Sequence, residues 1–385
     1  MAMFVLRRLL QGLLTLWVVV TLSFILMRLA PGGPFDKEKP LPPAVVANLK
    51  RTFGLAADLT TPLAGTLVRH AVQPGQEVAH RAPLAFVRTA DGQEQPVLAE
   101  QALTVVSLVG EPGRALQPGD TIAVRDTTVF EQYLTSVTSY AQLDLGVTFA
   151  SEGSTTVMQT LKATFPVSLE MGLFAVILAL LLGVSVGLLA GLYRNTWIDY
   201  VSMTGALAAV SMSSIVVGPL LVLCFGVWLQ WLPWGGWEPF SYKWMHLQVK
   251  ILPTITLALV YAAYFARLTR AGMLDVISQD FIRTARAKGL SEFAVVTRHA
   301  LRGAVLPAVS FLGPALAGIV TGSVVVERVF SVPGVGEYFV TAAVNRDYPL
   351  VMGTVVLYSS LLIVANIAVD VAYVALDPRV RGAHA

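Results

Sequence analysis

Residues 166–192, PVSLEMGLFAVILALLLGVSVGLLAGL, form an apolar run whose single charged residue is Glu170. A helix that crosses a bilayer needs about 20 consecutive apolar residues, because lipid cannot pair with exposed backbone N–H and C=O groups. The composition of the chain agrees, since 55% of its 385 residues are hydrophobic, 13% are charged and the mean hydropathy is +0.67. The sequence therefore predicts an integral membrane protein.

Similar apolar runs recur along the chain, and together they predict an all-α polytopic membrane domain with six transmembrane helices. Their ranges are 9–29, 166–192, 200–229, 252–267, 304–326 and 351–376. The fourth run is the shortest. Residues 1–30 thus hold the first helix, residues 166–376 hold the other five, and residues 377–385 form a tail on the same side as the N-terminus.

The short loops divide into a basic set and a poorly basic set, and this difference predicts the orientation. The basic set contains Arg7, Arg8, Arg194, Arg267, Arg270, Arg283, Arg286, Lys288, Arg298, Arg302, Arg379 and Arg381. The other set contains only Lys243, Lys250, Arg328 and Arg346. We expect the basic loops and both termini to face the cytoplasm from the inner membrane. A cleaved signal peptide is the alternative for the first run, which is longer than a typical h-region.

The long polar stretch between the first two runs, residues 31–165, must then be extracytoplasmic. From about 59 to 127 it is rich in Val, Thr, Pro and Gly in short runs, which is typical of a small all-β domain. Within it VQPGQEV at 72–78 is echoed by LQPGDTI at 116–122, and each Pro-Gly pair fits the centre of a type II turn. The flanks at 48–55 and 130–140 read as helical, so we interpret the β domain as an insertion.

The longest cytoplasmic loop, residues 267–302, contains the segment DFIRTARAKG at 280–289, which reads as a complete short helix. Asp280 can act as its N-cap, and Gly289 can end it in the left-handed conformation. Arg286 and Lys288 lie where the helix dipole favours cations. A solvated linker helix with a basic edge is the alternative interpretation of this segment.

This loop resembles the EAA loop of binding-protein-dependent importer permeases of the peptide/nickel family. The similar residues are RTARAKGL at 283–290, HALR at 299–302 and LP at 306–307, with Thr284 and Arg286 at the first and third EAA positions. Distant stretches resemble the same family: LSF at 22–24, RLAPG at 28–32, DLG at 144–146, the start of the run at 166–170, ERVFSVPGVG at 327–336, RDYP at 346–349 and DPR at 377–379. The resemblance covers nearly everything outside the β insertion.

The resemblance implies a type I ABC importer permease, which forms half of a pore for peptides or a related small solute. The implied partners are a second homologous permease, two ATP-binding subunits, an extracytoplasmic substrate-binding protein and membrane lipid. The residues implied in ATPase coupling are Asp280, Phe281, Arg283, Thr284, Ala285, Arg286, Ala287, Lys288, Gly289 and Leu290. Among them, Ala285 and Ala287 are small enough to permit a partner's close approach. The chain has no Gly-Lys pair and hence no Walker A loop, so a separate subunit must hydrolyse ATP.

Small and aromatic residues in the spans suggest further roles. Ser211, Ser213 and Ser214 are candidate pore-lining residues, with ordinary helix packing as the equal alternative. The glycines between 183 and 191 favour packing. Five tryptophans after the third run suit anchors at the lipid headgroups; they are Trp228, Trp231, Trp234, Trp237 and Trp244.

Other functions agree less well with the residues. A secondary transporter or a channel not driven by ATP is the main alternative, but the mid-span positions are nearly free of the charges that a coupling ion requires. The five histidines are scattered, so neither a metal site nor an enzyme is expected, and no cofactor is predicted. The basic residues cluster beside apolar segments, which excludes nucleic acid as an expected partner.

The β insertion resembles biotinyl/lipoyl-type domains, whose two halves are quasi-symmetric, in its paired turns and in the strands around 67–68, 105–106 and 122–124. In such carriers a lysine between the halves takes the cofactor. This chain has AEQAL at 99–103 and no lysine between Lys50 and Lys162, which excludes attached biotin or lipoate. Guiding a binding protein, capping the pore mouth and serving as a spacer all remain possible roles.

Overall fold

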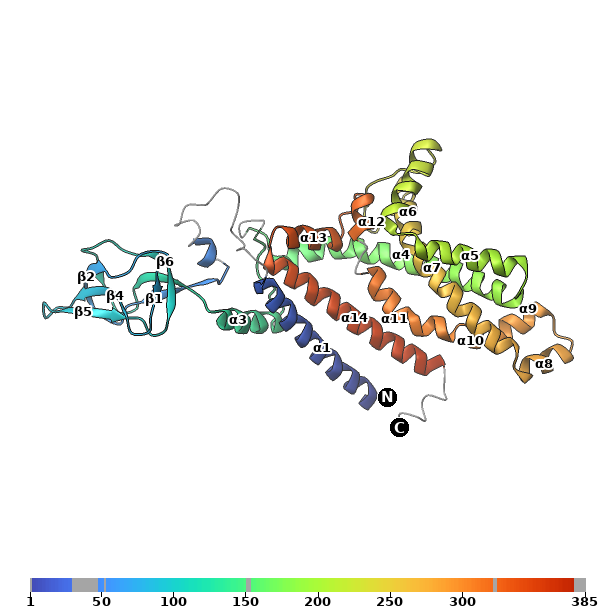
Figure 1. The fold of residues 1–385 in the computed structure, drawn as a ribbon, viewed down its shortest axis with the longest axis horizontal. Coiled ribbons are helices and arrows are strands. Elements are labelled where there is room, and N and C mark those ends of the chain that lie inside the picture. The colour runs from blue at the N-terminus through green and yellow to red at the C-terminus, as the bar shows by residue number, and fades with distance from the viewer. Residues whose placement is uncertain (1, 30–47, 52, 150–153, 321–323, 377–385) are drawn as a thin grey trace. The chain divides into compact units, whose positions relative to one another are not determined.

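The computed structural model describes residues 2–29, 48–51, 53–149, 154–320 and 324–376. The chain divides into two compact units. The helical unit comprises residues 1–23, 159–344 and 351–385, and the second unit comprises residues 24–158 and 345–350. Each is described by itself below (Figure 1). The predicted tail, residues 377–385, lies outside the described residues.

Among the described residues, four helices are long and apolar enough to cross a membrane. They are α1 (Ala2–Leu29), α4 (Val157–Leu192), α7 (Trp244–Ile277) and α14 (Tyr348–Leu376). The predicted fourth run, 252–267, was much too short, because α7 has 34 residues. Charged residues toward both ends of α7 lower its hydropathy, yet Lys250 and Arg270 are neutralised there by ion pairs inside the helical unit.

The third predicted span, 200–229, is not one continuous helix, although its two parts together are apolar and long enough for one broken span. It consists of α5 (Trp197–Ser211), α6 (Ser214–Leu221) and the π-helix η1 (Val222–Trp228), and the chain bends by 105° between α5 and the segment that starts at Ser214. Met212 is extended at the bend, and the Ser213 hydroxyl accepts a hydrogen bond from the backbone N–H of Ile215. Ser213 thus begins a new helix instead of continuing the old one.

The region of the predicted fifth span, 304–326, contains shorter helices. They are α10 (Leu301–Ala304), α11 (Leu306–Val320) and α12 (Val324–Val329), followed by α13 (Val335–Val344). At 15 residues α11 is shorter than a full membrane crossing needs. Over the described ranges, the count of candidate spans is therefore four, or five if the bent pair is one span.

Glycines on α4 allow α4 and α7 to pack very closely. A Cβ atom on Gly183 would come within 2.5 Å of the Ala262 carbonyl oxygen, and one on Gly187 within 2.5 Å of the Ala266 carbonyl oxygen. On the next turn, a Cβ atom on Gly191 would come within 2.6 Å of Met273. The backbones therefore touch along three turns, so the glycines serve the packing role predicted for them.

The second unit contains two four-stranded antiparallel sheets. The strands are β1 (Ala56–Thr60), β2 (Gly65–His70), β3 (Glu77–Val78), β4 (Pro83–Arg88), β5 (Glu94–Leu98), β6 (Leu103–Leu108), β7 (Ala115–Leu116) and β8 (Thr121–Asp126). Their order is β1-β8-β6-β3 in one sheet and β5-β4-β2-β7 in the other. An apolar core that includes Leu67, Val87 and Ile122 lies within them. The strands span residues 56–126, close to the predicted 59–127.

The two Pro-Gly turns repeat the same hydrogen bonds. Gly75 and Gly119 have φ values of +84° and +98°, as position i+2 of a type II turn requires. Gly75 N–H donates to the Val105 carbonyl at 2.7 Å, and Gly119 N–H donates to the Thr61 carbonyl at 2.8 Å. The two acceptor residues, Thr61 and Val105, are as far apart in the sequence as the two glycines. The similar segments 72–78 and 116–122 therefore form a structural repeat.

Helix α3 (Val129–Ala141) follows strand β8 and begins with a capping box. The Thr128 hydroxyl accepts from the Glu131 N–H at 3.2 Å, and the Glu131 carboxylate accepts from the Thr128 N–H at 2.8 Å. The hydrogen bonds from the Arg125 guanidinium lower the pKa of Glu131 to about 2. Glu131 therefore ties the start of α3 to the end of β8.

Candidate functional site

The candidate site is built around α8 (Asp280–Ala287), the short helix predicted in the 267–302 loop. Its N-cap is Gln279, so the predicted capping role of Asp280 was wrong. Asp280 is instead the first helical residue, where its charge still suits the helix dipole. At the other end Gly289 has a φ of +79°, the left-handed conformation predicted for it.

One face of α8 is sealed against the rest of the helical unit. Ile282 is fully buried and Ala285 is 5% exposed. They pack in a cluster with Met273 of α7 and with residues that follow α8, namely Val295, Ala300 and Ala304. The prediction that Ala285 permits close approach of a partner was therefore wrong, because the small side chain faces its own chain.

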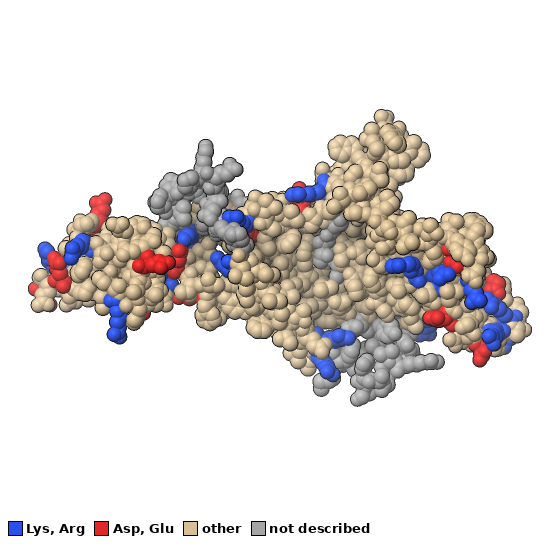
Figure 2. All heavy atoms as spheres, viewed as in Figure 1, with Lys and Arg blue, Asp and Glu red and all other residues tan. Residues whose placement is uncertain are grey.

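The opposite face of α8 is exposed, and it carries most of the predicted coupling residues. The exposed ones are Asp280, Phe281, Arg283, Thr284, Arg286 and Ala287 of α8, and Lys288, Gly289 and Leu290 directly after it. Phe281 is 50% exposed and Phe293, which the sequence analysis missed, is 79% exposed. Figure 2 shows Lys and Arg side chains gathered at the end of the helical unit where Figure 1 places α8. The exposed face therefore combines aromatic surface with positive charge.

An ion pair holds α8 to the segment that follows it. The Arg286 guanidinium donates to both carboxylate oxygens of Glu292, at 2.8 and 3.2 Å. Glu292 begins α9 (Glu292–Ala294), which leads into the π-helix η2 (Val295–Ala300) and then α10. The predicted loop 267–302 is thus mostly helical, and Arg286 already has a partner within the chain.

A second ion pair, between Asp199 and Arg270, joins α5 to α7. The Arg270 guanidinium donates to Asp199 Oδ1 at 2.6 Å and to Oδ2 at 2.7 Å. Asp199 is buried and also accepts from the Asn195 N–H at 3.0 Å. Sequence reasoning missed this pair; a lone Asp at the start of an apolar run was the available signal.

The far end of α7 carries a buried polar cluster, which we call the Glu170–Lys250 lock. Lys250 Nζ donates to Glu170 Oε1 at 2.8 Å and to the Ser241 carbonyl oxygen at 2.9 Å. Glu170 Oε2 accepts from the Trp237 indole N–H at 3.2 Å and from the Phe240 backbone N–H at 2.9 Å. The lock joins α4, α7 and the loop between η1 and α7.

Trp237 differs from its predicted role as an anchor, because it lies in the core beside the buried Glu170. Glu170 and Lys250 are only 4% and 3% exposed, so neither side chain extends to a membrane surface. Trp237 is 8% exposed and packs in the core, whereas Trp228, Trp231, Trp234 and Trp244 are all exposed as expected of anchors. Trp237 is therefore a structural part of the lock.

A neighbouring carboxylate orders the ERVFSVPGVG stretch. Glu327 is fully buried, and its carboxylate accepts from the Ser168 hydroxyl and from the Glu337 N–H, both at 2.9 Å. Any side chain on Gly334 would collide with the Glu327 carboxylate. Ser168 and Glu170 are two residues apart on α4, so this helix fixes both the Glu327 turn and the lock.

The three candidate pore-lining serines lie at the bend between α5 and α6. Ser211 and Ser213 are exposed and Ser214 is half-buried. The Ser211 hydroxyl donates to the Leu207 carbonyl at 2.8 Å, and Ser213 caps α6. Their part in forming the bend is a local structural role, and their contact with a transported solute stays a prediction.

Comparisons with known proteins agree with this architecture. A family model described as "Binding-protein-dependent transport system inner membrane component" matches residues 183–382. The chain is 37% identical to the oligopeptide transport system permease protein OppB of Salmonella typhimurium, over 99% of this chain and 100% of that protein. It is 33% identical to the dipeptide transport system permease protein DppB of Bacillus subtilis, over 99% and 98%.

Among solved structures, the inward-facing MetNI methionine ABC transporter matches with 18% identity and a TM-score of 0.45, over 57% of this chain and 97% of that chain. The family match and the near full-length relatives decide the assignment. The chain belongs to the family of binding-protein-dependent transport system inner membrane components, and it is a non-catalytic permease subunit of an ABC importer.

Proposed function

We propose that this chain forms half of the translocation pore of an oligopeptide importer, beside a second homologous permease. The relatives are named as oligopeptide and dipeptide permeases, which supports a peptide substrate. Two separate ATP-binding subunits drive the importer, and an extracytoplasmic binding protein delivers the peptide. We also propose six spans in the inner membrane with both termini and α8 in the cytoplasm, as the basic loops favour.

The observation that carries this proposal is the division of α8 into two faces. The buried face, with Ile282 and Ala285, packs on α7, so a partner that displaces α8 also acts on a long membrane helix. The exposed face presents Phe281 beside cations. Exposed aromatic and cationic side chains together are typical of a protein interface, and a solvated linker has no need of the aromatic one.

The alternative, a secondary transporter, needs ionisable groups that are free to bind and release a coupling ion. In the described spans, Glu170 is paired with Lys250 and Asp199 is paired with Arg270. These two carboxylates are therefore already paired with cations of the chain itself, and the buried Glu327 carboxylate is held by hydrogen bonds from the Ser168 hydroxyl and the Glu337 N–H. This arrangement favours an external motor.

We further propose that strands β1 to β8 form an inserted module of the biotinyl/lipoyl type without a cofactor. The two sheets and the repeated turns support this assignment. The absence of lysine between Lys50 and Lys162 leaves no amine for covalent attachment. The module would thus keep a carrier-type scaffold while serving another purpose.

Affinity purification of the tagged chain from its native membrane, followed by mass spectrometry, tests the proposal. We expect a second permease and ATP-binding subunits to co-purify, and the complex in liposomes to import peptides only with ATP. Phe281→Asp should release the ATP-binding subunits, whereas Leu143→Asp, the same kind of change at a 73% exposed leucine of the other unit, should not. A chain that imports peptides alone, without nucleotide hydrolysis, contradicts the proposal.

A further inference from the structure

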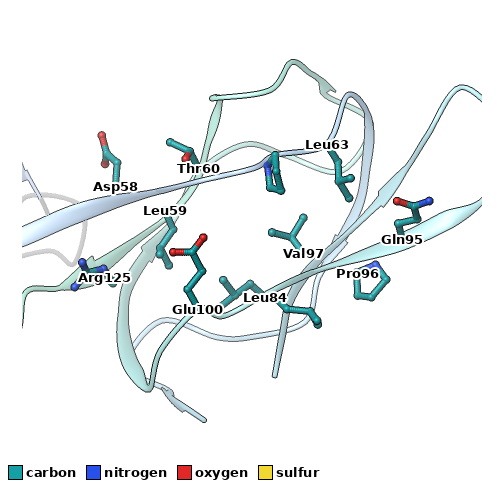
Figure 3. A pocket seen from close by; sticks show the side chains of 12 residues that line it. Asp58, Leu59, Thr60, Leu63, Leu84, Gln95, Pro96, Val97, Glu100 and Arg125 are labelled. Atoms are coloured by element: carbon teal, nitrogen blue, oxygen red, sulfur yellow. The ribbon is translucent and has the colours of Figure 1, made fainter. Parts of the chain in front are cut away.

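The β module contains a cavity of about 540 Å³ between its two sheets. Asp58, Leu59 and Thr60 of β1 line one side and residues 95–98 of β5 line the other (Figure 3). Strands β1 and β5 are the edge strands of their sheets. We call this opening the seam. Its volume falls in the range of about 300–1,000 Å³ that is usual for small-ligand sites.

Unpaired backbone groups lie along both sides of the seam. Within the described part of the chain, β1 pairs only with β8, and β5 pairs only with β4. Each edge strand therefore has outward N–H and C=O groups without a strand partner, and such an edge is a template for an added strand. Strand β1 is the better template, because Pro96 removes one donor from β5.

The floor of the seam is apolar. Leu84 and Val97 are buried there, and Leu59 and Leu63 are half-buried beside them. This surface suits an aliphatic side chain. An added strand alternates its side chains between two faces, so one face would rest on the floor while the other points to solvent.

One carboxylate in the seam, that of Glu100, has no partner among the described residues. Asp58 is paired with Arg51 at 2.8 Å, and Arg125 is paired with Glu131 at 2.9 Å. The Glu100 carboxylate, by contrast, has no ion-pair or hydrogen-bond partner among the described residues, and Figure 3 shows it pointing into the cavity. Between residues 56 and 126 the module has eight Asp and Glu against five Arg, a net charge of −3, although the whole chain has +3. The seam therefore favours a cationic ligand.

We propose that the seam binds the N-terminal residues of an extended oligopeptide. The α-ammonium group of the peptide pairs with Glu100, its main chain extends the sheet at β1, and an aliphatic side chain rests on the floor. Strand β1 has five residues, which matches about five extended peptide residues at roughly 3.4 Å each. The peptide as ligand rests on the proposed function; the acidic, apolar and edge-strand character of the site does not.

A second copy of the module is a poorer occupant of the seam. Two modules would each bring a net charge of −3 to the contact. A free peptide with an N-terminal ammonium group is instead attracted by the negative charge of the module.

Fluorescence anisotropy on the full-length chain in nanodiscs tests the proposal without any ATP-binding subunit. The probe is Leu-Val-Thr-Val-Gln with a free amine and a dye at its C-terminus. We expect saturable binding, with the dissociation constant raised about tenfold by Glu100→Gln and about tenfold by N-acetylation of the peptide, the two changes together doing little more than either alone. Glu111→Gln, which removes an exposed carboxylate of the same module outside the seam, should leave binding unchanged.

Equal binding by the Glu100→Gln and Glu111→Gln variants overturns the proposal, as does the absence of saturable binding up to millimolar peptide. Peptide import by the reconstituted complex separates this result from the proposed function. Import without binding at the seam refutes the inference alone. If peptide binds at the seam but the chain imports peptide without any ATP-binding subunit, the proposed function is refuted and the seam remains a peptide site.

Discussion

The two ends of α7 differ in how far their neighbouring side chains are buried. At one end the Glu170–Lys250 lock is closed, since both side chains are at most 4% exposed and each is bonded to groups of this chain. At the other end α8 buries Ile282 but leaves Phe281 half exposed. The first end is complete within one chain, whereas the second leaves aromatic side chains uncovered. The difference supports the proposal that α8, and not the lock, meets a partner.

A single helix connects these ends. Helix α7 has 34 residues, which corresponds to a length of about 50 Å. Lys250 lies in its second turn and Met273, which touches the α8 cluster, lies near its other end. Helix α7 is continuous over this length, with Pro253 inside it, and the lock fixes the position of the end away from α8.

The largest expected effect comes from opening the lock. Lys250→Met leaves the Glu170 carboxylate buried without its cation, which should destabilise the protein by about 3–5 kcal/mol. Thermal unfolding of the purified protein in detergent measures the loss. Lys243→Met, at an exposed lysine directly before α7, should change little.

The double variant Glu170→Met with Lys250→Met sharpens this prediction. Because the whole ion pair is then replaced by apolar side chains, much of the lost stability should return. If Lys250→Met and Lys243→Met behave alike, the lock does not hold this end and the contrast between the two ends fails.

A smaller effect is expected from separating α4 and α7. Gly187→Leu forces a side chain against the Ala266 carbonyl and Thr269, and overpacking of this kind costs about 1–3 kcal/mol. Gly205→Leu in α5 has nothing within 4 Å of the new Cβ atom and should not destabilise the protein. Equal unfolding temperatures for the two variants would show that the close contact is not needed.

The smallest effect is expected at the exposed end. Arg286→Gln breaks the pair with Glu292, but both side chains are well exposed, so the cost in stability is at most about 1 kcal/mol. The difference from wild type should shrink as salt is raised. A loss as large as that of Lys250→Met would mean that α8 is held as firmly as the lock, against the account given above.

The features that sequence reasoning predicted are local ones. The turns at Gly75 and Gly119 and the end of α8 at Gly289 each depend on a few adjacent residues, and all three glycines have the positive φ expected. The strand module was bounded to within a few residues for the same reason, because turn signals punctuate it.

The features that were missed depend on distant partners. Glu170 and Lys250 are 80 residues apart, and each lowers the local hydropathy although together they are buried. Ala285 is buried because it packs against Met273 and Val295. The pattern of apolar residues in the eight residues of α8 does not show which face these distant side chains cover. The bend at Ser213 was also hidden, since the run around it is apolar on both sides.

The central claim, that the exposed face of α8 meets a separate ATP-binding subunit, is tested most directly by cysteine cross-linking. Cys224 is the chain's single cysteine, so a Cys224→Ser background allows one site at a time. In the complex purified with its partners, Arg283→Cys on the exposed face should cross-link to an ATP-binding subunit, and Ile282→Cys on the buried face should not. Absence of the product from Arg283→Cys, or equal products from both positions, would contradict the account.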